Sequence, residues 1–105
     1  MAVRLLQINL KFSVASSDLK SAFAAVAGDI EAVPGLRWKI WILNDQEHEA
    51  GGIYLFEDPD SVRAYLEGPI VSGLKTHPAI SDISAKQFDV VEDLTAITHG
   101  PIKAG

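Results

Sequence analysis

The segment from residue 34 to residue 56 constrains the fold most, because it predicts two β-strands joined by a short polar loop. Strand-forming residues run from 36 to 43 and again from 48 to 57, and the polar run 44–47 between them suits a hairpin. The hairpin also holds both tryptophans and the pair Gly51-Gly52. Large rings beside residues without side chains either build a core or leave room for a flat ligand.

The composition narrows the class of protein. We expect one domain over residues 1–105, since 105 residues can bury a real core but fall short of the size at which chains divide. The net charge of −5 argues against nucleic acid as a partner, and the absence of cysteine excludes disulfides, thiolate catalysis and sulfur-ligated metals. There is no signal-peptide pattern and no apolar run of ~20 residues, so we expect a cytoplasmic protein without a membrane partner.

The rest of the chain predicts two further strands and the helices between them. Residues 3–12 alternate in polarity, and residues 16–33 repeat apolar side chains at helical spacing until Pro34-Gly35 ends the helix. Asp58-Pro59 predicts an N-cap and first turn of a second helix, which Gly68-Pro69 should interrupt before a further helical segment. We expect the last strand from about 83 to 91 and a partly ordered tail from 92 to 105.

This order of elements predicts an α+β fold. Strand, helix, strand, strand, helix, strand is the βαββαβ pattern of a ferredoxin-like sandwich, with a four-stranded antiparallel sheet and helices on one face. The second face of the sheet carries apolar residues, and an exposed apolar patch usually marks an interface. We therefore expect a homodimer formed sheet to sheet.

The hairpin register decides which rings face the helices. A four-residue loop pairs Leu43 with His48 and Trp38 with Ile53, and this pairing sorts the hairpin residues into two faces, of which we expect the first to lie under the helices. That face holds Leu36, Trp38, Ile40, Ile42, Gly51, Ile53 and Leu55, and the dimer face holds Arg37, Lys39, Trp41, His48, Gly52, Tyr54 and Phe56. A slip or a bulge at the glycine pair would exchange part of the two sets.

Several aromatic residues have two interpretations. Trp38 is either a core ring whose indole N–H finds a carbonyl, or a wall of a pocket opened at Gly51 and roofed by Phe23 and Tyr65. Three other hairpin rings are either dimer-core aromatics or ligand contacts, namely Trp41, Tyr54 and Phe56.

Polar candidates are few. Glu47 and Glu49 flank His48 and favour its protonated form, so His48 is either an acid or base, or a solvated hairpin histidine. Neighbouring strand residues point to opposite faces, so these three make a poor metal cage and we expect no metal. No glycine-rich phosphate loop is present, so we expect no cofactor.

Four stretches of the chain resemble a known family. They are Trp38-Lys39-x-Trp41, residues 48–56, residues 64–67 and residues 85–90, and together they resemble the YdhR-type mono-oxygenases of the dimeric α+β barrel superfamily. The resemblance implies an oxidoreductase that oxidises a small aromatic or polycyclic phenol without flavin, haem or metal. It implies a homodimer with a substrate pocket between sheet and helices. We expect Trp38, Phe23, Tyr65 and Trp41 to bind the substrate, and Tyr54 or His48 to act as the catalytic group.

Three other functions compete with this one. The same pocket would serve a non-catalytic binding or stress-response module that sequesters a hydrophobic metabolite. A haem-degrading mono-oxygenase would use a helix histidine and a strand asparagine, for which His77 and Asn9 are the candidates. A purely structural dimer would have no pocket at all.

Overall fold

One antiparallel sheet organises the computed structural model, which describes residues 2–102. Its strands are β1 (Arg4–Phe12), β2 (Leu36–Asn44), β3 (Glu49–Phe56) and β4 (Ile80–Asp89). They lie in the order β2-β3-β1-β4, and every neighbouring pair is antiparallel. Strands β1 and β3 are therefore the two central strands of the sheet, as the βαββαβ pattern predicts.

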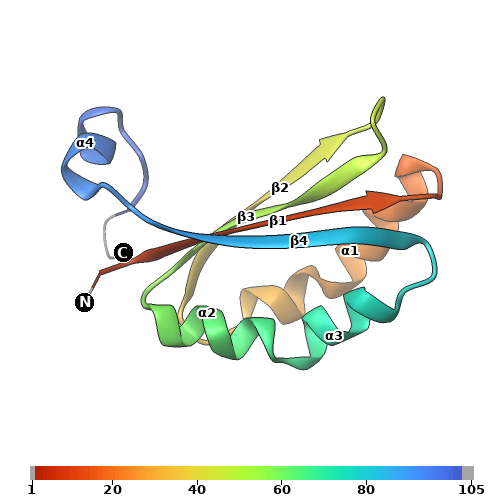
Figure 1. Ribbon diagram of the computed structural model, residues 1–105, viewed down its shortest axis with the longest axis horizontal. Coiled ribbons are helices and arrows are strands. Elements are labelled where there is room, and N and C mark those ends of the chain that lie inside the picture. Colours follow the sequence, from red (N-terminus) through yellow and green to blue (C-terminus); the bar gives the residue numbers. More distant parts are fainter. Residues whose placement is uncertain (1, 103–105) are drawn as a thin grey trace.

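Three helices cover one face of this sheet, and a fourth lies apart from them. Helices α1 (Ser16–Glu31), α2 (Pro59–Leu66) and α3 (Pro69–Thr76) lie below the sheet in Figure 1. The short helix α4 (Glu92–Ile97) follows β4 and lies beyond the end of the sheet, on the other side. Among residues 2–102, no helix is both long and apolar enough to cross a bilayer. The predicted ferredoxin-like fold is confirmed.

Local signals fixed the helix boundaries as expected. The Asp58 carboxylate accepts a hydrogen bond from the backbone N–H of Ser61 at 2.8 Å, which caps α2, and hydrogen bonding from Ser61 lowers the pKa of that carboxyl. Gly68-Pro69 separates α2 from α3, since proline cannot continue the preceding helix. The larger differences from the prediction lie near the C-terminal end, where β4 spans Ile80–Asp89 and the tail contains α4; the other strand and helix ends differ by one or two residues.

The core lies between the sheet and the helices. Side chains of β1 supply its centre, with Leu6 and Ile8 packed with Phe56 and with Val62 of α2. A second cluster joins Leu10, Phe12, Leu19 and Ala50 near the other end of the sheet. The alternation predicted for β1 is thus confirmed, because its even-numbered apolar residues all face the helices.

The predicted hairpin faces were wrong. Leu43 pairs with Ala50, and a bulge at Arg37 brings Trp38 opposite Leu55. The face under the helices carries the residues assigned to the dimer face, Lys39, Trp41, Gly52, Tyr54 and Phe56. The outer face carries Trp38, Ile40, Ile42, Ile53 and Leu55. The physical reason is packing, because the large rings of Tyr54 and Phe56 fill the space between the sheet and the helices and are 3% and 0% exposed.

Candidate active site

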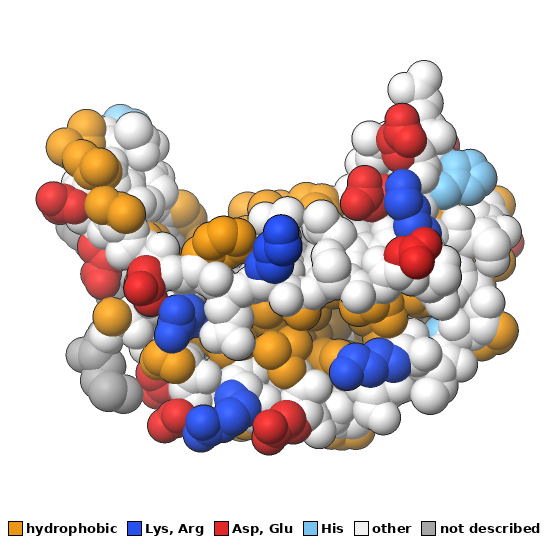
Figure 2. Space-filling view, in the orientation of Figure 1, with side chains coloured by type: hydrophobic (Ala, Val, Ile, Leu, Met, Phe, Trp, Pro, Cys, Tyr) orange, Lys and Arg blue, Asp and Glu red, His pale blue; other side chains and the backbone are white. Residues whose placement is uncertain are grey.

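A cavity of about 830 Å³ lies between the sheet and the helices. Strands β1, β2 and β3 and the start of β4 form one side of it, and α1, α2 and α3 form the other. Figure 2 shows hydrophobic side chains gathered in the hollow between the sheet and the helices below it. Most of the wall is apolar, with Leu10, Leu19, Val26, Ile70, Leu74 and Ile80 among its residues. A cavity of this size and lining suits an organic molecule with a few fused rings.

Two aromatic pairs line the cavity. The rings of Phe23 on α1 and Trp41 on β2 are 5.0 Å apart between centroids, at an interplanar angle of 44°. The rings of Tyr54 on β3 and Tyr65 on α2 are 5.3 Å apart. Together these rings offer flat apolar surfaces from both the sheet and the helices, as a planar ligand requires.

The two tyrosines also share a hydrogen bond in the buried part of the site. Their hydroxyl oxygens lie 3.1 Å apart, so one hydroxyl donates to the other. Burial raises the pKa of Tyr54, and the neighbouring Tyr65 raises it further; burial also raises the pKa of Tyr65. Both phenols therefore stay neutral at physiological pH. One O–H of the pair remains free to donate to an oxygen of a bound molecule.

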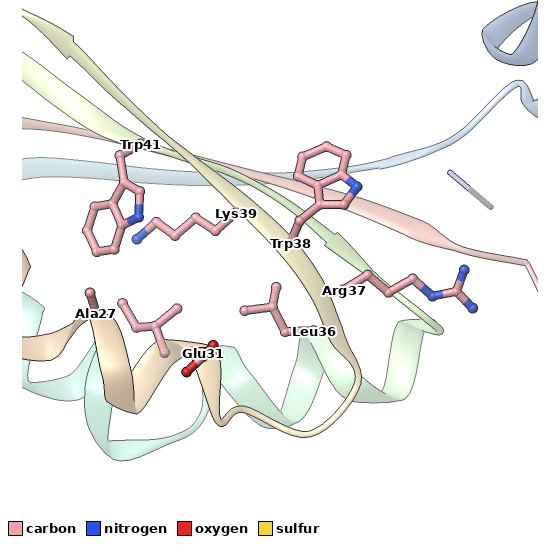
Figure 3. A pocket seen from close by; sticks show the side chains of 8 residues that line it. Ala27, Glu31, Leu36, Arg37, Trp38, Lys39 and Trp41 are labelled. Carbon is pink, nitrogen blue, oxygen red and sulfur yellow. The ribbon is translucent and has the colours of Figure 1, made fainter. Parts of the chain in front are cut away.

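Lys39 brings an amine to the cavity wall. Its Nζ lies 3.4 Å from the centroid of the Trp41 ring and 4.6 Å from that of Tyr54. Within residues 2–102 the amine has no carboxylate at ion-pair distance. Desolvation by burial lowers the pKa of Lys39 to about 7. Figure 3 shows Lys39 beside the ring of Trp41, with Trp38 across the strand.

The glycine pair explains how Lys39 reaches this position. A Cβ added at Gly52 would collide with the Cε of Lys39 and crowd the Tyr54 ring. A Cβ added at Gly51 would collide with the backbone carbonyl of Ile8 on the neighbouring strand. Gly52 therefore leaves space for the stem of Lys39, and Gly51 allows the close approach of β1. Lys39 was missed as a site residue because its strand face was assigned to the dimer. The available signal was the spacing Lys39-x-Trp41, since Trp41 pairs with Gly52 and both side chains lie on the face where Gly52 leaves space.

Four of the predicted site residues meet in the cavity, namely Phe23, Trp41, Tyr54 and Tyr65. Trp38 is not among its lining residues. Its indole Nε1 donates to the backbone carbonyl of Pro101 at 2.7 Å, on the outer side of β2. Trp38 borders instead a smaller pocket of about 200 Å³ at the edge of β2 (Figure 3). The indole N–H thus finds a carbonyl, as the core interpretation expected, but that carbonyl belongs to the C-terminal segment.

The histidines lie away from the aromatic pairs. His48 is exposed in the hairpin turn, where its ring stacks on Phe12 at 5.3 Å, and it does not line the cavity. His77 is exposed at the cavity rim, and its Nδ1 accepts a hydrogen bond from the backbone N–H of Ala79. Asn9 faces the outer side of the sheet beside Gln7, so the sheet separates it from His77. In the described part of the chain, no three acidic, histidine or cysteine residues group to hold a metal ion.

Solved structures share this fold. A protein of unknown function from Nitrosomonas europaea superposes with a TM-score of 0.74 at 17% identity, covering 87% of this chain and 91% of its own. SnoaB from Streptomyces nogalater, a cofactor-independent oxygenase, gives 0.70 at 18% identity, covering 88% and 96%. The haem degrader MhuD from Mycobacterium tuberculosis gives 0.64 at 22% identity, covering 83% and 95%. At these identities the likeness shows the fold.

The family is shown by the sequence itself. No curated protein sequence matches the chain significantly. The family model described as "Putative mono-oxygenase ydhR" matches residues 5–101, which is nearly the whole chain and includes every residue of both aromatic pairs. The chain therefore belongs to the ydhR mono-oxygenase family, which places it among the oxidoreductases.

Proposed function

We propose that the protein is a cofactor-independent mono-oxygenase that oxidises a small aromatic or polycyclic phenol in the cavity between sheet and helices. The observation that carries the proposal is the cavity of about 830 Å³, walled by apolar side chains and four rings with a few polar groups among them. Family membership and the shared fold of SnoaB support the reaction class.

The substrate itself supplies the electrons in this mechanism. In an anthrone-like compound, a CH2 group between two rings becomes C=O, one oxygen atom of O2 enters the product, and the other leaves as water with the two hydrogens. The reaction balances without an external reductant. The protein's part is to hold the rings, to manage one proton and to exclude water.

The residues divide these tasks. Phe23 and Trp41 hold the ring system between α1 and β2, and Tyr65 closes the cavity from α2. Tyr54, paired to Tyr65 at 3.1 Å, donates its hydroxyl hydrogen or that of its partner to a substrate oxygen that gains negative charge. His48 and Trp38 are given no part in this mechanism, since neither lines the cavity.

The proposed assembly is a homodimer in which the outer sheet faces pack together. Ile40 on β2 is 51% exposed and Phe88 on β4 is 45% exposed. The sheet is flanked by the hairpin end and by α4, whose exposed apolar residues include Leu94 and Ile97, so that the upper surface in Figure 2 forms a saddle. A second copy would cover these side chains.

The proposed location is the cytoplasm, as expected from the sequence. Cell fractionation tests it.

Oxygen uptake tests the reaction. Purified protein is mixed with anthrone in air-saturated buffer, with an oxygen electrode recording uptake and absorbance recording the quinone. We expect uptake and quinone in equal amounts, faster than without protein. If anthrone-like phenols bind without being oxidised under air, the protein is a binding module instead.

Haem degradation is a second candidate, favoured by the shared fold of MhuD, whose structure holds two haems. The separation of His77 from Asn9 by the sheet speaks against it within one chain. A shifted Soret band on addition of haemin, lost in His77→Ala, would support it.

A further inference from the structure

The amine of Lys39 is a group that the proposed mechanism has not used. It reaches the cavity from β2 and lies against the rings of Trp41 and Tyr54. Gly52 provides the space for its stem, since any side chain there would collide with it. The four-carbon stem passes over Gly52 and places the nitrogen against the aromatic wall.

The surroundings of Lys39 leave its charge without a counter-ion. Among the described residues that line the cavity, Asp18 and Asp29 of α1 and His77 after α3 are exposed at the rim. Glu31 of α1 and Arg37 of β2 border the smaller pocket on which Lys39 also lies. None of the three carboxylates lies at ion-pair distance from Lys39. The phenols of Tyr54 and Tyr65, from β3 and α2, stay neutral because burial raises the pKa of each.

We propose that Lys39 accepts the proton of an acidic hydroxyl on the bound ring compound and then holds the resulting oxyanion as its counter-ion. The cavity would therefore select ring compounds that carry a phenolic or enolic hydroxyl over the same rings without one. This inference rests on the proposed function, because it assigns Lys39 to the proton step of that reaction and names the group that a substrate must carry.

The step is a simple proton transfer. The O–H bond of the ligand breaks, its electron pair stays on oxygen, and a new N–H bond forms on the neutral amine. Burial lowers the pKa of Lys39 to about 7, so the amine is mostly neutral above that pH and can accept a proton. An oxyanion beside it reverses the effect of burial, because opposite charges attract strongly in an apolar cavity. The electron-rich oxyanion is also the form of a phenol that gives an electron to O2.

The test uses 2-naphthol, because its long-wavelength absorption distinguishes naphthol from naphtholate and no oxidation is needed. At about pH 8 the free compound is neutral, since phenols ionise near pH 10. We expect the compound bound to wild type to be at least tenfold more ionised than the free compound, with no net release of protons to solvent. In Lys39→Met we expect the bound compound to be neutral. Lys75→Met, an exposed lysine change on α3, should match wild type.

A second ligand separates the two proposals. 2-Methoxynaphthalene has the same rings and no acidic proton, so it should bind wild type and Lys39→Met equally within about twofold, which also shows that the variant keeps its cavity. Equal ionisation of 2-naphthol in wild type and Lys39→Met overturns the role of Lys39 while leaving the ring site intact. Release of about one proton on binding to wild type also overturns it, since the amine was then already charged. If neither compound binds wild type, the ring site itself is refuted along with it.

Discussion

Tyr54 and Tyr65 show how one pair of residues serves both the fold and the site. Their hydroxyls bond to each other at 3.1 Å in a place where their rings are 3% and 6% exposed. A buried hydroxyl without a partner costs free energy, so each satisfies the other. The pair is held by packing against Phe56, whose centroid lies 5.7 Å from that of Tyr65. The site's polar pair is thus part of the core.

We predict that Tyr54→Phe destabilises the protein by roughly 1–3 kcal/mol, because it leaves the Tyr65 hydroxyl buried and unpaired. Urea denaturation measures the change. In the double variant Tyr54→Phe/Tyr65→Phe much of that loss should return, since no hydroxyl is left unpaired. Oxidation of anthrone should be slower in both variants. A stability loss in the double variant equal to the sum of the two single losses would contradict the coupling.

Lys39 gives the stability of the protein a particular pH dependence. Its pKa falls from 10.5 in the unfolded chain to about 7 in the fold, so between these values the unfolded state binds more protons. The contribution of Lys39 to the free energy of unfolding therefore rises with pH from about 7 to 10, by no more than about 1.4 kcal/mol per pH unit. Comparison of wild type with Lys39→Met over this range measures it, because methionine removes the titrating amine.

At the scale of elements, the sequence did not determine which face of the β2–β3 hairpin lies against the helices. Period-two alternation in β2 and β3 sorted their residues into two sets, but alternation is symmetric and does not say which set the helices cover. The loop is displaced by one residue from the predicted position, because Asn44 pairs with Glu49, and the bulge at Arg37 shifts the end of β2. Only packing decides which face the helices cover, since the rings of Tyr54 and Phe56 pack against α2 and α3. Trp38 was misplaced and Lys39 overlooked for this one reason.

Other elements could be predicted because single residues determine them. Pro59 and the Asp58 cap begin α2, and Gly68-Pro69 separates it from α3. Helix α4 escaped prediction because it has six residues, no side-chain cap and no buried residue, so its sequence carries no amphipathic signal. The four rings of the cavity come from four different elements, α1, β2, β3 and α2, and their contacts follow from how these elements pack rather than from any local pattern.

Alanine substitutions at Gly51 of β3 and at Gly28 of α1 should change the stability of the protein in opposite directions. Gly51→Ala should destabilise the protein by about 1–3 kcal/mol, because its Cβ meets the carbonyl of Ile8 across the β1–β3 ladder. Gly28→Ala should stabilise it by about 0.5–1 kcal/mol, since the position is helical and has open space around it. Thermal unfolding measures both. Equal effects from the two substitutions would contradict the close approach of the strands.

Gly52→Ala acts on the site more than on the sheet. Its Cβ meets the Cε of Lys39 and the ring of Tyr54, and the flexible lysine stem can move aside. We therefore expect Gly52→Ala to displace the amine and to reduce the ionisation of bound 2-naphthol severalfold, with a smaller loss of stability than Gly51→Ala. Unchanged ionisation would argue against the role of Gly52 in holding Lys39.

On the scale of the whole molecule, the sheet has one face in the core and one face open. The open face carries Ile40 and Phe88, and nothing within residues 2–102 covers them fully. The sequence predicted an apolar second face correctly but named the wrong hairpin residues for it. The expectation of a dimer is the same with either set of hairpin residues, because each would leave apolar surface in water.

We predict that Ile40→Glu and Phe88→Glu convert the protein to a monomer, because a charge within a sheet-to-sheet contact must be buried without a partner. Light scattering coupled to size exclusion measures the mass. Ala24→Glu, an exposed change on α1, is the control and should leave the mass unchanged. A wild-type protein that is already monomeric at micromolar concentration would contradict the proposed assembly.

The sheet separates the two indoles of this chain, and fluorescence can exploit that separation. Trp38 lies on the outer side, bonded to the carbonyl of Pro101, whereas Trp41 lies on the cavity wall against Phe23 and Lys39. Trp41→Phe leaves the Trp38 emitter on the outer side, where a partner subunit would pack, and Trp38→Phe leaves the Trp41 emitter on the wall of the cavity. Two spectra from one protein would then follow the proposed association and the proposed ligand binding.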